Sequence, residues 1–264
     1  MKAIISCTQD EKYSYFIPIV TWTWNKLGVG VVLFLPESSK GDEKIQLGLN
    51  CMNYRYKENS HYYFDMPKHK EATAAQCVRL YGACLDLPED EVLITGDVDM
   101  LMFRLPEMIE GGFSIFGSDL VPDKQYPMCY ISAKVKDWRT AFELEGKSYQ
   151  QCLDELMKDR DSISMRSDFW ALDQEIAYNK INLTQGIHYI PRTNGQNQFA
   201  QNRYDRDDSF ILDRLNPDTI DFHMNRPGYE DKNFEIILTI LKYHYPQDDF
   251  QWLMDYTNAY KQLL

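Results

Sequence analysis

The chain has 264 residues, of which 44% are apolar and 26% charged, a composition typical of a soluble globular protein with a substantial core. Its formal net charge of −12 argues against non-specific binding to nucleic acid or to an anionic membrane surface. No apolar run approaches the ~20 residues that span a bilayer, and the first residues lack the pattern of a signal peptide. We therefore expect a cytoplasmic protein that has no integral membrane segment and binds no nucleic acid.

The first part of the chain alternates between apolar runs and longer amphipathic segments. Strands are predicted at residues 3–7, 30–35, 62–65 and 91–95, and helices at residues 15–27 and 70–87. Residues 37–48 between them are polar and are predicted to be a loop with a short helix. In the helix at 70–87 the apolar stripe leaves Arg79 on the polar side. This alternation indicates an α/β fold with a mainly parallel sheet.

Two carboxylates, Asp97 and Asp99, follow the strand at 91–95, and apolar residues resume at Met100. Like charges held between buried segments repel each other and lose hydration. A divalent cation removes both problems, and carboxylate oxygens suit Mg²⁺ or Mn²⁺. The alternative is a polar turn whose aspartates cap a helix or face water.

Other polar residues also follow predicted strands. Thr8, Gln9 and Asp10 come after the first strand, and Asp65 closes the third. Because ligands of parallel sheets collect at the carboxyl ends of the strands, these residues are candidates for contacting a nucleotide.

The second half is predicted to contain strands at 113–116 and 128–132 and helices at 149–158, from Ser167 or Asp168 to about 181, at 230–243 and at 247–263. Asp173 falls in the middle of the buried stripe of the helix that ends near 181, so it either pairs with a buried Arg or Tyr or lines a cavity. Residues 193–208 are predicted to be a long polar loop, either surface decoration or a lid or acceptor contact. His223 and Arg226 group a metal-capable imidazole with a cation.

These features together resemble the GT-A glycosyltransferases, over roughly residues 2–228. The segment Leu93 to Met102 looks like the family's D-x-D after a hydrophobic strand. Residues 70–81 are similar to the helix that precedes it and often bears a basic residue near the donor. Residues 167–174 look like the helix whose acidic or amide pair, here Asp173 and Gln174, faces the reacting sugar.

The resemblance implies one GT-A-like catalytic domain over residues 1–264, in which a mixed, mainly parallel, Rossmann-like sheet is flanked by helices. It divides into a nucleotide-binding half (1–105), an acceptor-side half (106–228) and a C-terminal helical pair (229–264). The implied reaction is metal-dependent transfer of a sugar from a nucleotide-diphosphate sugar, with UDP favoured, to a glycan or other hydroxyl acceptor. Stereochemistry is left open, so Asp173 is either the general base of an inverting enzyme or the group that orients the sugar in a retaining one.

The resemblance also assigns the ligands. Mn²⁺, or Mg²⁺, would be held by Asp99 and His223, and by Asp97 either directly or through water. Residues expected at the nucleotide-sugar donor are Thr8, Gln9, Asp10, Asp65, Arg79, Asp97 and Arg226. An ordinary half-buried histidine is the alternative for His223, and a surface ion pair is the alternative for each arginine.

Two other functions stay open. A sugar-nucleotide nucleotidyltransferase shares the nucleotide-binding half, but a glycine-rich basic loop should follow its first strand, and residues 7–12 contain no glycine. A non-catalytic nucleotide- or carbohydrate-binding module would bind the nucleotide without transferring or hydrolysing the donor.

Overall fold

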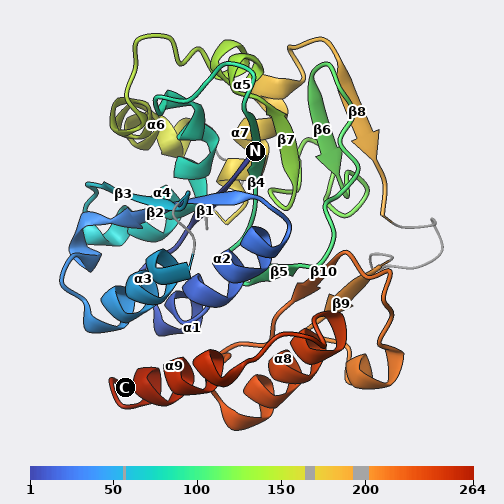
Figure 1. The fold of residues 1–264 in the computed structure, drawn as a ribbon. Helices are drawn as coiled ribbons and strands as arrows, with labels where there is room; N and C mark the ends of the chain where they lie inside the picture. The colour runs from blue at the N-terminus through green and yellow to red at the C-terminus, as the bar shows by residue number, and fades with distance from the viewer. Residues whose placement is uncertain (56–57, 164–169, 193–201) are drawn as a thin grey trace.

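The fold is seen in a computed structural model that describes residues 1–55, 58–163, 170–192 and 202–264. A seven-stranded sheet forms its centre, with the strand order β3-β2-β1-β4-β7-β6-β8 (Figure 1). The strands are β1 (Lys2–Ser6), β2 (Gly30–Pro36), β3 (Ser60–Phe64), β4 (Val92–Thr95), β6 (Phe113–Phe116), β7 (Ile131–Lys134) and β8 (Ile187–Ile190).

The sheet is mixed and mainly parallel, as predicted. Strands β1 to β4 are parallel to one another, β7 is antiparallel to both β4 and β6, and β8 is parallel to β6. Helices cover both faces of the sheet, and every residue of β2 is buried. This burial on both faces accounts for the unbroken apolar run in its sequence.

One face of the sheet is covered by α1 (Glu11–Ser14), α2 (Ile17–Lys26) and α3 (Glu43–Arg55). The other is covered by α4 (Glu71–Val78), the 3₁₀ helix η3 (Arg79–Cys84), α5 (Val135–Phe142), α6 (Tyr149–Ile163) and α7 (Leu172–Ile181). Short 3₁₀ turns lie at η1 (Glu37–Ser39), η2 (Lys68–Lys70) and η4 (Ile211–Arg214). Within the described residues no helix is both long and apolar enough to cross a membrane.

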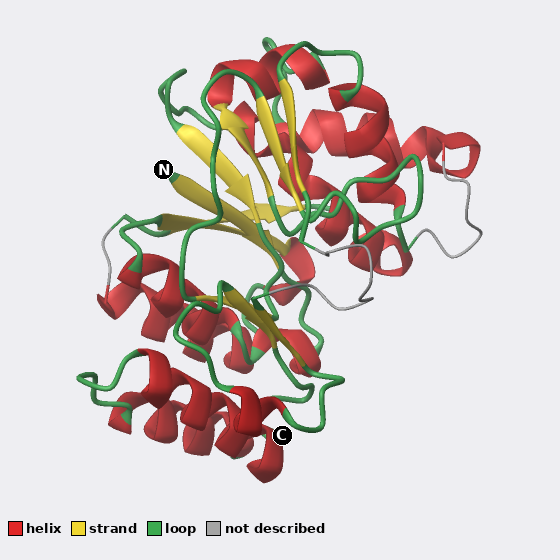
Figure 2. Cartoon of the chain, turned by 90° about the vertical axis from the view of Figure 1, so that its right-hand side faces the viewer, coloured by secondary structure: helices red, strands yellow, loops and turns green. Residues whose placement is uncertain are grey.

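A second, three-stranded sheet has the order β5-β10-β9, formed by β5 (Met100–Met102), β10 (Asp221–His223) and β9 (Arg203–Asp205). Strand β10 is antiparallel to β5 and parallel to β9. The predicted C-terminal helical pair, α8 (Asp231–His244) and α9 (Gln251–Lys261), packs in the same core cluster as this sheet (Figures 1 and 2). Because β5 follows β4 directly, the Asp97–Asp99 turn connects the two sheets.

The structure corrects three element predictions. The α-helix predicted at 70–87 ends at Val78 and continues as η3. Residues on all sides of this segment are buried, and Arg79, expected on a polar side, is buried with them. The short helix predicted within residues 37–48 is the start of a longer one, α3, which continues to Arg55. Part of the predicted 193–208 loop is strand β9, because it pairs with β10. Residues 193–201 of that loop and the predicted helix caps Ser167 and Asp168 lie outside the described residues.

Candidate functional site

The Asp97–Asp99 turn begins where β4 ends, at Thr95. The Thr95 hydroxyl donates to the Met128 carbonyl at 2.7 Å and accepts the Ile131 N–H at 3.0 Å, which fixes the end of β4 against β7. The two aspartates then face different surroundings. The Asp97 side chain is 36% exposed and the Asp99 side chain 9%. Only Asp99 is therefore held in a largely desolvated position.

Arg79 bridges Asp97 and Asp173. Its Nη1 donates to the Asp97 carboxylate and, at 2.8 Å, to the Gly96 carbonyl, and its Nη2 donates to Asp173 Oδ2 at 2.8 Å. The prediction that Asp173 faces inward is confirmed, and its buried arginine partner is one of the two explanations offered for it. The turn after β4 and the start of α7 are thereby joined through one guanidinium group.

The Asp173 carboxyl is mostly ionised at neutral pH and becomes protonated when the pH falls slightly below neutral. Burial raises its pKa to about 6, although the positive charge of Arg79 acts in the opposite direction. The backbone N–H of Gln174 also donates to Asp173 Oδ1 at 2.9 Å and favours the charged form. A carboxyl group with this pKa can accept or donate a proton near neutral pH.

Strand pairing brings His223 to Asp99. His223 lies opposite Met100 in the β10–β5 ladder, and the backbone N–H of Met224 donates to the Asp99 carbonyl at 3.0 Å. The His223 Nε2 is then 3.4 Å from Asp99 Oδ2, while its Nδ1 is 3.7 Å from Asp205 Oδ2. Burial lowers the pKa of His223, but the neighbouring carboxylates of Asp205 and Asp99 outweigh it and raise the pKa to about 9.

Two arginines approach the same carboxylate. Arg206 Nη1 is 3.2 Å and Arg226 Nε is 3.5 Å from Asp99 Oδ2. Burial raises the pKa of Asp99, but His223 and both arginines outweigh this and lower it below its ordinary value. Three cationic side chains thus surround the single carboxylate of Asp99, and such a cluster is suited to an anionic ligand.

The segment after β1 lies beside this cluster. Arg226 packs its guanidinium 4.7 Å from the centre of the Tyr13 ring and donates to the Tyr13 hydroxyl. Burial raises the pKa of the Cys7 thiol, and the charges of Asp10 and Asp99 raise it further, which places both carboxylates near this cysteine. Asp10 itself accepts the Lys12 N–H at 2.9 Å and caps α1. Thr8 accepts the Asp10 N–H at 3.3 Å.

Two predicted donor residues have other neighbours. Gln9, with its amide in the orientation that satisfies both partners, donates to the Ser38 carbonyl at 3.2 Å and lies beside Lys68. Asp65 follows β3, two strands from β1, and its backbone exchanges hydrogen bonds of 2.8 and 2.9 Å with Gln150. The Asp65 side chain is exposed. The roles of both residues at a donor stay predictions.

Sequence reasoning missed Arg206, Asp205 and Tyr13. Arg206 and Asp205 were included only in the predicted polar loop, and nothing in their spacing relates them to Asp99. The pairing of β9 with β10 sets Asp205 opposite His223, and it therefore decides their place in the site. Tyr13 has no sequence signal beyond its position shortly after β1.

The residues present fit a metal ion held partly by the protein. Two ligands about 2.1 Å from one ion, at tetrahedral to octahedral angles, lie about 3.0–3.4 Å apart. Asp99 Oδ2 and His223 Nε2 are separated by 3.4 Å. The described residues contain no group of three or more His, Cys, Asp or Glu side chains arranged to hold a metal. Asp97, the third predicted ligand, is bound to Arg79. The remaining ligands would have to be water or substrate oxygens.

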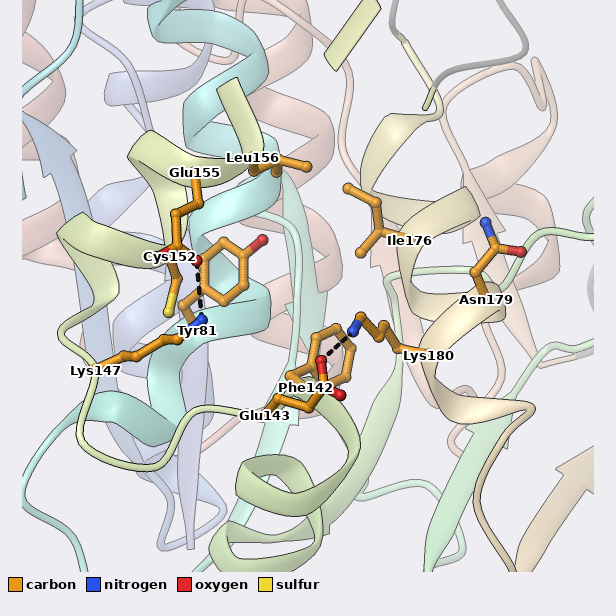
Figure 3. Close-up of a pocket in the computed structure, with 10 residues that line it drawn as sticks. All are labelled: Tyr81, Phe142, Glu143, Lys147, Cys152, Glu155, Leu156, Ile176, Asn179 and Lys180. Atoms are coloured by element: carbon orange, nitrogen blue, oxygen red, sulfur yellow. Dashed lines mark hydrogen bonds and ion pairs between the residues drawn. The ribbon is translucent and has the colours of Figure 1, made fainter. Parts of the chain in front are cut away.

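A different cavity, of about 290 Å³, lies among η3, α5, α6 and α7 (Figure 3). Ion pairs between Lys147 and Glu155 at 2.9 Å and between Lys180 and Glu143 at 2.7 Å flank its apolar walls. It contains none of the predicted site residues. It therefore belongs to the helical layer rather than to the Asp99 cluster.

No protein-family description matches the sequence, and no curated protein does. Solved structures do resemble the chain. A crystal structure of the galactosyltransferase LgtC in complex with donor and acceptor sugar analogues aligns with a TM-score of 0.51 at 10% identity, over 97% of this chain and 100% of that one. The fold is of the GT-A type. This likeness establishes the fold and leaves the activity to be argued from the site.

Two further structures are similar at lower scores. An active-site mutant of LgtC has a TM-score of 0.48 at 10% identity, over 90% of this chain and 96% of that one. The apo form of the glycosyltransferase GlyE from Streptococcus pneumoniae TIGR4 has a TM-score of 0.46 at 10% identity, over 99% of this chain and 64% of that one.

Proposed function

We propose that the chain is a metal-dependent glycosyltransferase that moves a sugar from a nucleotide-diphosphate sugar, with UDP favoured, to a glycan or other hydroxyl acceptor. The observation that carries the proposal is the contact of His223 with Asp99, at 3.4 Å, in the turn that joins the two sheets. These residues come from segments more than 100 positions apart, and the turn lies at the carboxyl end of a central parallel strand, where α/β folds bind ligands.

In this proposal Asp99 and His223 hold Mn²⁺ or Mg²⁺, and the imidazole ligand favours Mn²⁺. When bound, the metal would offset the negative charge of a departing nucleotide diphosphate. Arg206 and Arg226, which both pair with Asp99, are placed to exchange that contact for donor phosphate oxygens. Asp205 is a positioning residue, because it faces Nδ1 of His223 and leaves Nε2 for the metal.

Asp173 is proposed as the catalytic carboxylate. Its pKa of about 6 keeps it mostly ionised at neutral pH, so it can take a proton from an acceptor hydroxyl or orient the sugar. Arg79 holds it 2.8 Å away and fixes it relative to Asp97. If Asp173→Asn retained full transfer activity, this role would be wrong.

Thermal-shift measurements with UDP, GDP, CMP and dTDP, each with and without Mn²⁺, test the donor site. We expect UDP with Mn²⁺ to raise the melting temperature more than either does alone, because the protein supplies only part of the metal shell. Asp99→Ala should lose this joint effect, and Asp218→Ala, which removes an exposed carboxylate paired with Arg104, is the matched control. If no nucleotide gives a metal-dependent shift, the proposal fails.

A further inference from the structure

A cavity of about 460 Å³ lies between the loop of residues 118–126, α7 and β8. Its volume falls within the range of small-molecule sites, about 300–1,000 Å³. Three tyrosines line it. The ring centres of Tyr126 and Tyr178 are 5.2 Å apart, and those of Tyr126 and Tyr189 are 6.0 Å apart. Tyr126 is buried, whereas Tyr189 is 53% exposed and presents its ring to solvent.

Hydrogen bonds hold this aromatic lining in place. Asn182 Oδ1 accepts from the Tyr126 hydroxyl at 2.6 Å and from the Tyr189 hydroxyl at 3.3 Å, and the two hydroxyls are 2.8 Å apart. Both hydroxyls bind the side-chain oxygen of Asn182. The side-chain nitrogen of Asn182 makes no hydrogen bond with any described residue. The lining is thus fixed before any ligand arrives, which lowers the entropic cost of binding.

A buried amide also lines the cavity. Gln125 is 7% exposed, and its side chain makes no hydrogen bond with any residue in the described part of the chain. Neither polar atom of this amide is fully enclosed, so both open to the cavity and can pair with a ligand that offers donors and acceptors.

The charge of the lining distinguishes between ligand classes. Asp119, Asp123 and Lys124 line the cavity, so the acidic groups outnumber the basic one, and a phosphate would be repelled. A sugar ring matches the remaining features. Its C–H face can stack on the exposed Tyr189 ring, and its hydroxyls can pair with the Asn182 and Gln125 amides.

Helix α7, which carries Asp173 near its start, forms one wall of the cavity. The backbone N–H of Tyr126 donates to the Gln174 carbonyl at 3.2 Å. Tyr178 lies one turn beyond Gln174 on the same side of α7, and Asn182 follows directly after the helix. At 1.5 Å and about 100° per residue, Tyr178 and Asn182 lie about 7.5 and 13.5 Å along the helix axis from Asp173, and about 140° and 180° around the helix from it. A ligand that reaches both places must be longer than one sugar ring.

We propose that this cavity is a saccharide subsite, which holds a sugar ring of a glycan acceptor whose reacting hydroxyl lies at Asp173. The acceptor is therefore an oligosaccharide rather than a monosaccharide or a small alcohol. This inference rests on the proposed transferase function, which gives the acceptor its role. The saccharide binding itself can be measured independently of transfer.

Saturation-transfer NMR tests the subsite, with methyl glycosides of glucose, galactose, mannose and N-acetylglucosamine and the di- and tetrasaccharides built from each as probes. UDP and Mn²⁺ are present throughout. We expect at least one oligosaccharide to bind more tightly than its methyl glycoside, and Tyr189→Ala to weaken that binding about tenfold through loss of the stacking ring. Tyr189→Phe keeps the ring and should lose less. Tyr243→Ala, at another partly exposed tyrosine (39%), is the matched control and should bind as the wild type does.

The outcomes separate this inference from the proposed function. If no saccharide binds the wild type, or if Tyr189→Ala binds as tightly as Tyr243→Ala, the subsite is refuted, and a nucleotide- and metal-dependent thermal shift in the same samples would leave the transferase proposal standing. If the thermal shift is absent while Tyr189-dependent saccharide binding is present, the cavity binds carbohydrate but its acceptor role is refuted.

Discussion

Replacing Arg79 by methionine should destabilise the protein in a way that depends on pH. Arg79 is buried and donates to Asp97, to Asp173 and to the Gly96 carbonyl. Methionine fills part of the volume but leaves the Asp173 carboxylate buried without its cation. Removing one partner of a buried ion pair costs about 3–5 kcal/mol. The loss at Asp97 adds little, because that side chain is 36% exposed and can be hydrated.

The pH dependence follows from the Asp173 titration. Its pKa of about 6 in the folded protein exceeds its ordinary value of 3.8, so the folded state binds the extra proton and stability falls as the pH rises from about 4 to 6. Without Arg79 the pKa rises further, and stability continues to fall above pH 6. We therefore expect Arg79→Met to cost about 1–2 kcal/mol at pH 5, from lost hydrogen bonds, and about 3–5 kcal/mol at pH 8.

Urea denaturation, followed by the fluorescence of the five tryptophans, measures the free energy of unfolding of variant and wild type at pH 5 and at pH 8. Arg79→Met combined with Asp173→Asn should recover much of the loss at pH 8, because the uncompensated charge is gone. Arg104→Met is the matched control. That arginine pairs with Asp218 at the surface, its side chain is 55% exposed, and its loss should cost less than about 1 kcal/mol at either pH. An equal cost of Arg79→Met at pH 5 and pH 8 would show that the uncompensated Asp173 charge is not the cause of the loss.

Three further outcomes are expected. Asp99→Ala should abolish Mn²⁺-linked UDP binding in calorimetry while its circular dichroism spectrum stays that of the wild type; unchanged binding would reject Asp99 as a ligand. Because a metal must displace the proton that His223 holds below a pKa of about 9, the Mn²⁺ affinity measured with UDP should rise from pH 7 to 9, by at most about tenfold per unit, and a flat profile would contradict this. Asp221→Asn should cost about 3–5 kcal/mol at pH 7 in urea denaturation, because it removes the carboxylate that pairs with the buried Arg192 and Arg203. Burial raises the pKa of Asp221, but the two arginines outweigh this and lower it below its ordinary value. The difference in free energy of unfolding between variant and wild type should therefore narrow as the pH falls below about 4, where the stabilisation from the ionised Asp221 is lost.

Local pattern was enough to predict much of this fold. The apolar runs that became β1, β2 and β4 are short and bounded by glycine, proline or polar residues, and burial on both faces leaves little ambiguity about such strands. The position of Asp97 and Asp99 after β4 follows from their adjacency to it. The inward direction of Asp173 follows from the helical period. Each of these predictions depends only on neighbours within a few residues.

Tertiary structure decided which of these residues meet. His223 reaches Asp99 only because β10 pairs with β5, and Asp205 and Arg206 arrive only because β9 pairs with β10. Three-residue strands carry too short a pattern to be recognised, and sequence spacing does not encode their partners. Arg79 was expected on a polar face and is buried instead, because two carboxylates from other elements offset its charge there. Local sequence patterns identified Asp99, His223 and Asp173 as candidates, whereas long-range strand pairing added Asp205 and Arg206 and set the geometry of the site.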